Sequence, residues 1–317
     1  MDSEPNYLPC PADLGERLES HSRFTLSIGT SVRVGRQLKL ANVDLGAAKL
    51  TRRNMRRVIL RQCKLFCTDM RGVDAVEGEF NGSDMTAADL SDGNFSQTKM
   101  RGINLSRAVL NNTRFDGADF SPYHPTTPEG EEVAGSVSQS SRFGSVTGKG
   151  ASFVGATLND TVFDKANLQD ANFAYARVGD ISLRGADLRG ADFSMADLPN
   201  SLAETVIAGG GKVPKAATPS EVYMAVENHA SWLQSDGKVG KRADLRGVNM
   251  VGLNLDGVDL SGANLSQANL ARASLRGARL ICTDLRGANL NQADLKDADF
   301  RGAMLDQAFG FMPAGSM

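Results

Sequence analysis

The sequence contains little of the material from which disulfide scaffolds and metal or cofactor sites are built. Its 317 residues include four cysteines, three histidines and one tryptophan, and aromatic residues make up only 6%. Four cysteines are too few for a disulfide framework in a chain of this length. Three histidines leave little scope for metal binding or acid–base catalysis. We therefore expect no catalytic residue, no metal site and no cofactor, and the chain is predicted not to be an enzyme.

The sequence also lacks an excess of charge and a long apolar segment. Lys and Arg number 35 against 37 for Asp and Glu, and the isoelectric point is near 6.0, so no global charge indicates a nucleic-acid partner. No apolar run approaches the roughly 18 residues of a membrane span. Residues 1–16 are polar, acidic and interrupted by proline, unlike a signal peptide. These features predict a cytoplasmic protein with no membrane span, small-molecule substrate or nucleic-acid partner.

The abundant feature is a period of five residues. The stretch SGANLSQANLARASLRGARL, residues 261–280, contains four copies of one phrase, each closed by a leucine with an alanine two places earlier. Apolar residues recur at every fifth position in three runs, over 40–120, 153–198 and 245–305. In the third run the position two before the centre is alanine in 9 of 13 phrases. In each phrase two positions are therefore suited to burial in a core, and three are suited to exposure to solvent.

Neither a helix nor a straight strand accommodates this period. Five residues turn a helix by about 500°, so the apolar positions would drift around its axis. In a strand, five is odd, so successive centres would alternate between faces. The pattern is preserved if the chain turns a corner at every phrase, because four corners then make a coil of twenty residues with all centres inward. Phenylalanines twenty apart, Phe95 and Phe115 or Phe153, Phe173 and Phe193, would form columns in the core.

The phrase ADLRGADF, residues 186–193, and the phrases after Leu255 resemble the A(D/N)LXX repeat of the pentapeptide repeat family. This resemblance implies a right-handed quadrilateral parallel β-helix, in agreement with the twenty-residue coil. It further implies a bacterial, mostly non-enzymatic protein family. The best-understood members of that family mimic DNA and protect or inhibit type II topoisomerases.

Two interruptions divide the repeat. The segment 121–142 is rich in proline, serine and acidic residues, which predicts a loop, and Phe143 is in phase with the run that follows. His124 lies in this loop, where we expect it to be solvated. The stretch AGGGKVPKA favours a linker over 201–217. The predicted domains are therefore 1–200, with runs at 40–120 and about 143–198, and 218–317.

One helix is predicted before the third run, and a similar sequence pattern occurs near the amino terminus. Thr218, Pro219 and Glu221 form a capping-box signature, so a helix is expected over about 219–234. The stretch LGERLESHSRF, residues 14–24, aligns with VYMAVENHASW, residues 222–232, at an offset of 208. Both contain a histidine on the apolar face, His21 and His229. We expect each helix to cap the amino-terminal end of its own β-helical body, with its histidine hydrogen-bonded to the first coil.

One cluster of charge exceeds what the repeat requires. Residues 33–64 contain ten Lys and Arg and a single acid, Asp44, whereas 65–120 contain nine acids and five bases. A solvated charge run and a docking patch both fit this composition. Four arginines lie one or two residues after apolar centres and are predicted to point outward. These candidate patch residues are Arg52, Arg56, Arg57 and Arg61. Arg53, in contrast, occupies a position expected to face inward.

A solenoid presents long regular faces, which favours binding over catalysis. The predicted function is a non-catalytic protein-interaction or scaffold module, in which the arginine patch docks an acidic protein partner. A DNA-mimicking regulator of a type II topoisomerase is the alternative, although the basic first coils and a net charge of −2 disfavour it.

Overall fold

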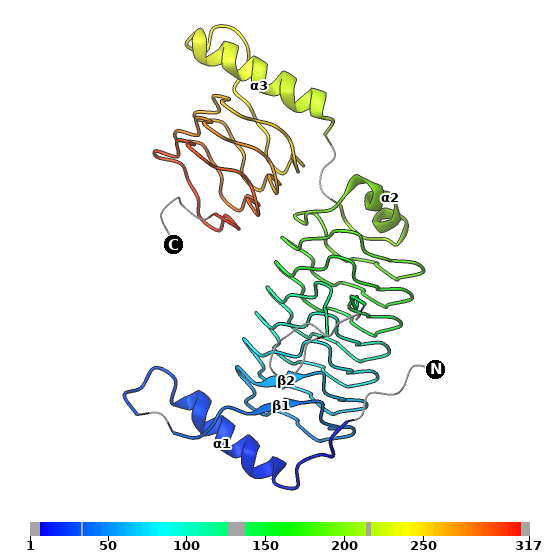
Figure 1. Ribbon diagram of the computed structural model, residues 1–317. Helices are drawn as coiled ribbons and strands as arrows, with labels where there is room; N and C mark the ends of the chain where they lie inside the picture. The colour runs from blue at the N-terminus through cyan, green and yellow to red at the C-terminus, as the bar shows by residue number, and fades with distance from the viewer. Residues whose placement is uncertain (1–6, 33, 126–136, 214–216, 312–317) are drawn as a thin grey trace. The chain divides into compact units, whose positions relative to one another are not determined.

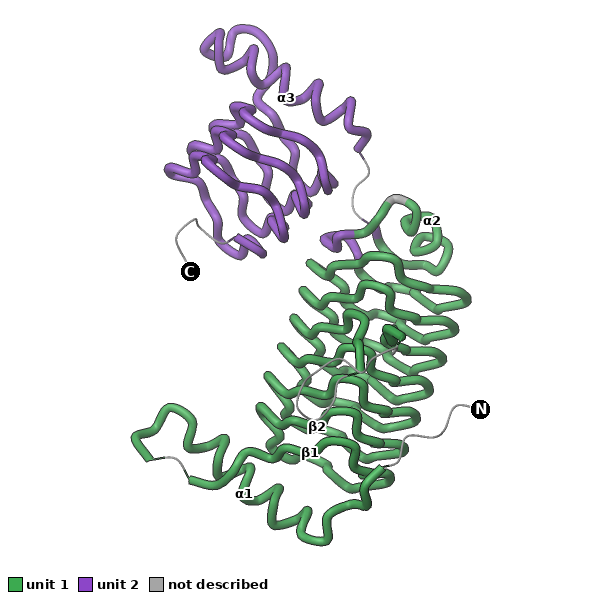
Figure 2. The backbone as a smooth tube through the Cα atoms, viewed as in Figure 1, with its two compact units in different colours: residues 1–192, 198–212 green, residues 193–197, 213–317 purple. Residues whose placement is uncertain are grey.

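The computed structural model describes residues 7–32, 34–125, 137–213 and 217–311, which form two compact units (Figures 1 and 2). Unit 1 comprises 1–192 and 198–212, and unit 2 comprises 193–197 and 213–317. Unit 1 contains helix α1 (Leu14–Leu26), strands β1 (Lys39–Ala41) and β2 (Ile59–Arg61), and helix α2 (Asn200–Ala208). Unit 2 contains helix α3 (Pro219–Gln234). The rest of both units consists mainly of stacked coils (Figure 1).

The coils repeat every twenty residues, as the five-residue period predicts. β1 pairs with β2 in parallel, with Leu40 opposite Leu60. Single parallel bridges continue this register along both units, for example Asp69 to Asp89 and Asn264 to Asp284. The fold of each stack of coils is therefore a parallel β-helix.

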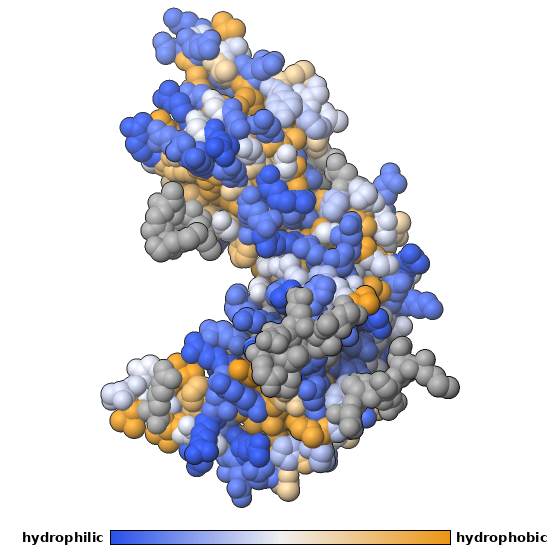
Figure 3. All heavy atoms as spheres, in the orientation of Figure 1, coloured by the Kyte–Doolittle hydropathy of each residue, from blue (hydrophilic) through white to orange (hydrophobic). Residues whose placement is uncertain are grey.

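Each phrase ends in a tight turn that explains its polar residues. The carbonyl oxygen of a centre such as Leu45 accepts a hydrogen bond from the amide three residues on, at Ala48 (3.1 Å). Ala47, between them, has φ +56°, as the third residue of a type II turn requires. The Asn or Asp before a centre stabilises the chain at the same corner, since Asp89 Oδ1 accepts from the amide of Ser91 (3.0 Å). Polar residues therefore cover much of the outer face of the coils (Figure 3).

The core of unit 1 contains the predicted column of phenylalanines. Ring centroids are 5.7 Å apart for Phe95 and Phe115, 5.3 Å for Phe115 and Phe153, and 4.9 Å for Phe153 and Phe173. Phe193, which belongs to unit 2, is also fully buried. The rings of Phe153 and Phe173 are almost parallel, with an interplanar angle of 5°. The five-residue register is therefore confirmed through this part of the core.

The loop predicted over 121–142 is an insertion at one corner of a continuous stack. Before it, Asp84 pairs with Asn104, which is twenty residues on; across it, Asn104 pairs with Arg142, which is 38 residues on. Eighteen residues are thus added, and the coils before and after them remain adjacent. Tyr123 and Gln139 exchange backbone hydrogen bonds of 2.9 and 2.8 Å at the base of the insertion. Residues 126–136 of the predicted loop lie outside the described residues.

The prediction of a linker over 201–217 is wrong for most of that segment. Helix α2 occupies Asn200–Ala208, and the chain after it continues the parallel ladder, in which Lys212 pairs with Asp192. Gly209 O accepts from the amide of Leu188 (3.0 Å), and the amide of Lys212 donates to Ala191 O (2.8 Å). Val206 is fully buried. A short helix and a further step of the parallel ladder therefore occupy the segment in which the glycine-rich sequence suggested free chain.

Helix α3 has the bounds and the cap that the sequence predicts. It spans Pro219–Gln234, the hydroxyl of Thr218 accepts from the amide of Glu221, and the Glu221 carboxylate accepts from the amide of Thr218. Helix α1 begins after Asp13, whose side chain makes no cap hydrogen bond and instead binds Arg17 (2.8 Å).

Candidate interaction surface at the amino-terminal end of unit 1

The four arginines predicted to form a patch all lie on the outside of the coils. Arg52 and Arg57 occupy corner positions with φ +55° and +59°. Arg56 and Arg61 each follow a buried centre, Met55 and Leu60. The outward direction expected for these side chains is therefore correct.

Three of these arginines bind carboxylates on the next coil. Arg56 pairs with Asp74 (3.3 Å), Arg57 with Glu77 (2.5 Å) and Arg61 with Glu79 (2.5 Å). Each acid lies 18 or 20 residues on, so a count along the sequence assigns it to a separate acidic segment. Basic and acidic residues thus lie next to each other in space, and the excess of positive charge in residues 33–64 is partly neutralised by acids of the next coil.

Other cations at this end of unit 1 make no ion pair with a described residue. They are exposed to solvent and lie on α1, on the chain that leads into β1, or on the first coil. We call them the unpaired cations: Arg23, Arg36, Lys39, Lys49, Arg52 and Arg53. Arg53 was expected to face inward, but it is exposed because the first coil has no preceding coil to enclose that position. Arg33 lies outside the described residues.

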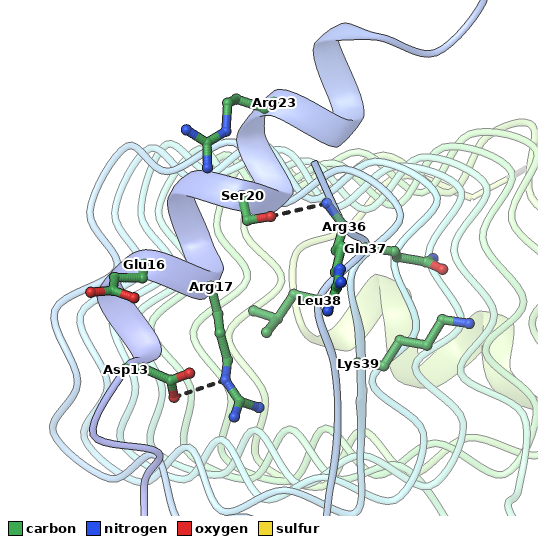
Figure 4. Close-up of a pocket in the computed structure, with 9 residues that line it drawn as sticks. All are labelled: Asp13, Glu16, Arg17, Ser20, Arg23, Arg36, Gln37, Leu38 and Lys39. Carbon is green, nitrogen blue, oxygen red and sulfur yellow. Dashed lines mark hydrogen bonds and ion pairs between the residues drawn. The ribbon is translucent and has the colours of Figure 1, made fainter. Parts of the chain in front are cut away.

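A cleft of about 620 Å³ lies between α1 and the chain that leads into β1 (Figure 4). Its lining consists of Asp13, Glu16, Arg17, Ser20, Arg23, Arg36, Gln37, Leu38 and Lys39. Arg17 and Arg36 extend into the space between the helix and the strand, whereas Gln37 and Lys39 extend from the other side of the strand (Figure 4). The backbone amide of Arg36 donates to the hydroxyl of Ser20 (3.0 Å), which holds one wall to the other.

The same junction of helix and coil occurs in both units. The Nδ1 atom of His21 accepts from the amide of Leu38 (3.0 Å), and that of His229 accepts from the amide of Ala243 (3.2 Å). Both imidazoles are fully buried, as expected of histidines that join a helix to the first coil. In each ring Nε2 is also buried and makes no hydrogen bond of standard geometry.

Burial lowers the pKa of both imidazoles. For His21 the main-chain groups of Met55 and Arg56 offset only part of this effect, and for His229 the backbone of Ser261 plays the same part. Both histidines are therefore held in the neutral form, in which Nδ1 can accept a hydrogen bond.

A glycine allows the close contact between helix and chain at each junction. A Cβ atom on Gly35 would lie 2.1 Å from Ser20 O, and one on Gly240 would lie 2.2 Å from Asn228 O. Both glycines have positive φ, +85° and +79°. The backbone of the two junctions is thus duplicated in detail.

Three of the four cleft cations are not duplicated with it, whereas Arg36 corresponds to Lys241. The positions that correspond to Arg17, Arg23 and Lys39 hold Ala225, Ser231 and Asp244 in unit 2. The same backbone junction therefore forms without these three charges, so the fold does not require them.

The cysteines form no disulfide, and burial raises the pKa of the Cys63 thiol to about 11. His124 is exposed. Within the described residues, no group of three His, Cys, Asp or Glu side chains is placed to hold a metal ion. None of the described helices is both long and apolar enough to cross a membrane.

Three solved structures resemble this chain at low identity. HetL, a pentapeptide repeat protein involved in heterocyst differentiation regulation in the cyanobacterium Nostoc sp. strain PCC 7120, is 20% identical; the match covers 92% of this chain and 97% of HetL, with a TM-score of 0.33. Trypsin-treated QnrB1, a plasmid-mediated fluoroquinolone resistance protein, is 14% identical over 86% of this chain and 91% of QnrB1, with a TM-score of 0.28. A pentapeptide repeat protein of the Arabidopsis thaliana thylakoid lumen is 22% identical; the match covers 44% of this chain and 77% of that protein, with a TM-score of 0.18.

No curated protein matches the chain. A family model described as pentapeptide repeats matches in eight copies, which together span more than half of the 317 residues. The matched segments are 63–102, 88–121, 149–174, 166–202, 241–277 and 278–309. They coincide with coils of both units. Each coil of twenty residues consists of four five-residue repeats. The chain therefore belongs to the pentapeptide repeat family.

Proposed function

We propose that this protein is a non-catalytic interaction module whose amino-terminal surface in unit 1 docks an acidic protein partner. The observation that supports this is the set of unpaired cations at that end. They are exposed, no described carboxylate neutralises them, and the corresponding junction of unit 2 forms without most of them. Exposed like charges that the fold does not use raise the local concentration of partners of opposite charge.

The four arginines of the predicted patch are part of this surface, but three of them already form ion pairs. Arg52 is unpaired, whereas Arg56, Arg57 and Arg61 are bound to acids of the next coil. Their side chains remain 42–46% exposed, so each guanidinium keeps donors for a second carboxylate. Such exposed ion pairs contribute only about 0–1 kcal/mol each to stability. A partner can therefore engage these arginines at little cost to the fold.

We further propose that α1 and α3 act as caps of two β-helical bodies. An uncovered coil exposes apolar core and unpaired backbone groups. The buried histidine bonds and the close glycine contacts at both junctions support this role. In unit 1, α2 and the ladder residues after it would cover the opposite end.

The alternative of a DNA-mimicking topoisomerase regulator requires rows of free carboxylates. In the described part of unit 1, many acids are instead bound by arginine. Arg71 contacts Asp69 (2.8 Å) and also approaches Asp89 (3.7 Å), and it lowers the pKa of Asp69 well below its usual range. Interleaved charges of this kind favour docking of a protein over mimicry of a phosphate backbone.

The proposal is tested with a quadruple Arg→Ser variant at positions 52, 56, 57 and 61. Tagged parent and variant are used for co-purification at low and high salt, and the bound proteins are identified by mass spectrometry. We expect the variant to fold and to lose acidic partners that the parent retains at low salt, because screening shortens the reach of exposed charges to about 8 Å at physiological ionic strength.

A matched control carries Arg→Ser at four exposed positions elsewhere in unit 1, namely 107, 114, 184 and 189. Its net charge changes equally, so it should retain the partners. Equal recovery of the same partners by the parent and both variants would show that the patch is a solvated face.

A further inference from the structure

One edge of strand β1 is not paired with any described residue, and the first residue of that strand, Lys39, lines the cleft beside α1. Leu38 O accepts from the amide of Ile59 (3.0 Å), and the amide of Asn42 donates to Arg61 O (3.1 Å). Because neighbouring residues of a strand direct their backbone groups to opposite sides, the amide and carbonyl of Lys39 and Ala41 point away from β2. No hydrogen bond joins these four groups to a described residue. β2, in contrast, has neighbours on both sides, β1 and Glu79.

The next side of the same coil shows that an extended segment can pair with this edge. Leu8 bridges Val43 in parallel, with its amide 2.6 Å from Asn42 O and its carbonyl 2.8 Å from the amide of Asp44. This addition satisfies the backbone of the 42–44 side only. No described segment pairs with the β1 side, and an unpaired edge of this kind can accept an added strand.

Charge selects the kind of segment that would fill the cleft. Its lining carries four cations and two carboxylates. The Arg17 guanidinium is bound by Asp13, while those of Arg23 and Arg36 and the Lys39 ammonium make no ion pair with described residues. The unit 2 junction, which has the same backbone but Ala225, Ser231 and Asp244 at three of these positions, provides an internal comparison without the excess of positive charge.

We propose that the cleft between α1 and β1 binds an extended acidic peptide segment, which adds as a parallel strand to the free edge of β1 and places carboxylates at Arg36 and Lys39. This inference rests on the proposed function, because it assigns the acidic partner a binding mode. The backbone of Lys39 and Ala41 supplies the pairing, and the cations on either side of the strand supply the selection for acidic side chains.

The test uses a fluorescein-labelled peptide of alternating Asp and Val, about ten residues long, titrated by fluorescence anisotropy at low salt. Lys39→Pro removes the edge amide without touching a bond to β2, and proline is tolerated at such an edge. Lys39→Ala keeps the amide and removes only the charge. We expect Lys39→Pro to bind about tenfold more weakly than Lys39→Ala, as the loss of one hydrogen bond implies. Arg36→Ser should also weaken binding.

Two controls separate the cleft from the rest of the surface. Asp244→Pro makes the same backbone change at the corresponding edge of unit 2 and should leave binding unchanged. The double variant Arg52→Ser, Arg53→Ser removes unpaired cations outside the cleft and should weaken binding less than Arg36→Ser. Circular dichroism and thermal melting verify that each variant folds.

The outcomes distinguish this inference from the proposed function. In one outcome the peptide binds the parent and is displaced by salt, Lys39→Pro and Arg36→Ser bind as the parent does, and the double variant loses binding. That result would show that an acidic partner docks on the outer surface, and it would overturn the strand-addition mode. If the parent binds no acidic peptide, both proposals fail. If light scattering shows a dimer that Lys39→Pro dissociates, the edge belongs to a second copy and the peptide mode is overturned.

Discussion

The side chain at the centre of each five-residue phrase is held by neighbours one coil away, so its contribution to stability depends on the column in which it lies. Phe173 is fully buried and stacks on Phe153, while Phe66, one residue after the centre Leu65, is 45% exposed. The two phenylalanines therefore offer the same substitution at an inward and an outward position.

Phe173→Ala should lower the free energy of unfolding by about 3–5 kcal/mol, because it removes a buried ring and leaves a cavity. Phe66→Ala should cost far less, about 1 kcal/mol or below. Chemical denaturation of both variants and the parent measures the difference. Similar losses at the two positions would contradict the inward and outward register of the repeat.

The buried histidines should make the stability of both junctions depend on pH. Their folded-state pKa lies below the ordinary value of 6.5, so the unfolded chain binds more protons as the pH falls through that value. Stability is thus fully present above about pH 6.5 and decreases below it. We expect the melting temperature to fall between about pH 7 and pH 5.5.

His21→Asn combined with His229→Asn is the control for this prediction, since an Asn side-chain oxygen can accept the same backbone hydrogen bond without titrating. The double variant should show a flatter dependence on pH. The same slope in parent and variant would place the titrating groups elsewhere.

At the scale of elements, the sequence predicts the features that have a period or a local signal. The capping box of Thr218 and Glu221 is such a signal, and α3 begins and ends where it was predicted. Helix α2 was missed because it is only nine residues long, has no capping side chain and is followed by three glycines. Two of those glycines are constrained by the structure: Gly210 has φ +85°, and a Cβ on Gly211 would lie 2.7 Å from a methyl carbon of Val206.

The candidate surface was predicted only in part, for a related reason. The outward direction of Arg52 and Arg57 follows from the register and is correct. Whether an arginine is neutralised depends on the residue that faces it on the next coil. To predict that residue, the twenty-residue offset has to be applied to the charged positions as well as to the apolar centres. Applied in that way, the offset pairs Arg57 with Glu77 directly. The cleft beside α1 had no sequence signal, because its cations come from two separated segments.

At the scale of the whole molecule, the chain contains two units with the same order of helix, glycine, histidine contact and coils. In unit 2 the core includes Val222 of α3 together with Leu245 and Met250 of the first coil. The unit therefore has its own apolar core and its own helix over the first coil, which are the requirements for independent folding.

We accordingly expect residues 213–317, expressed alone, to fold and to unfold in one cooperative transition, with a circular dichroism spectrum of parallel β-structure and one helix. A shorter fragment, 241–317, lacks α3 and leaves the first coil exposed. Burial of one large apolar side chain contributes roughly 1.5–3 kcal/mol, and α3 also supplies His229, which accepts a hydrogen bond from the amide of Ala243. The shorter fragment should therefore melt at a lower temperature or aggregate. Equal stability of the two fragments would show that α3 does not act as a cap, and an unstructured 213–317 would show that unit 2 depends on the rest of the chain.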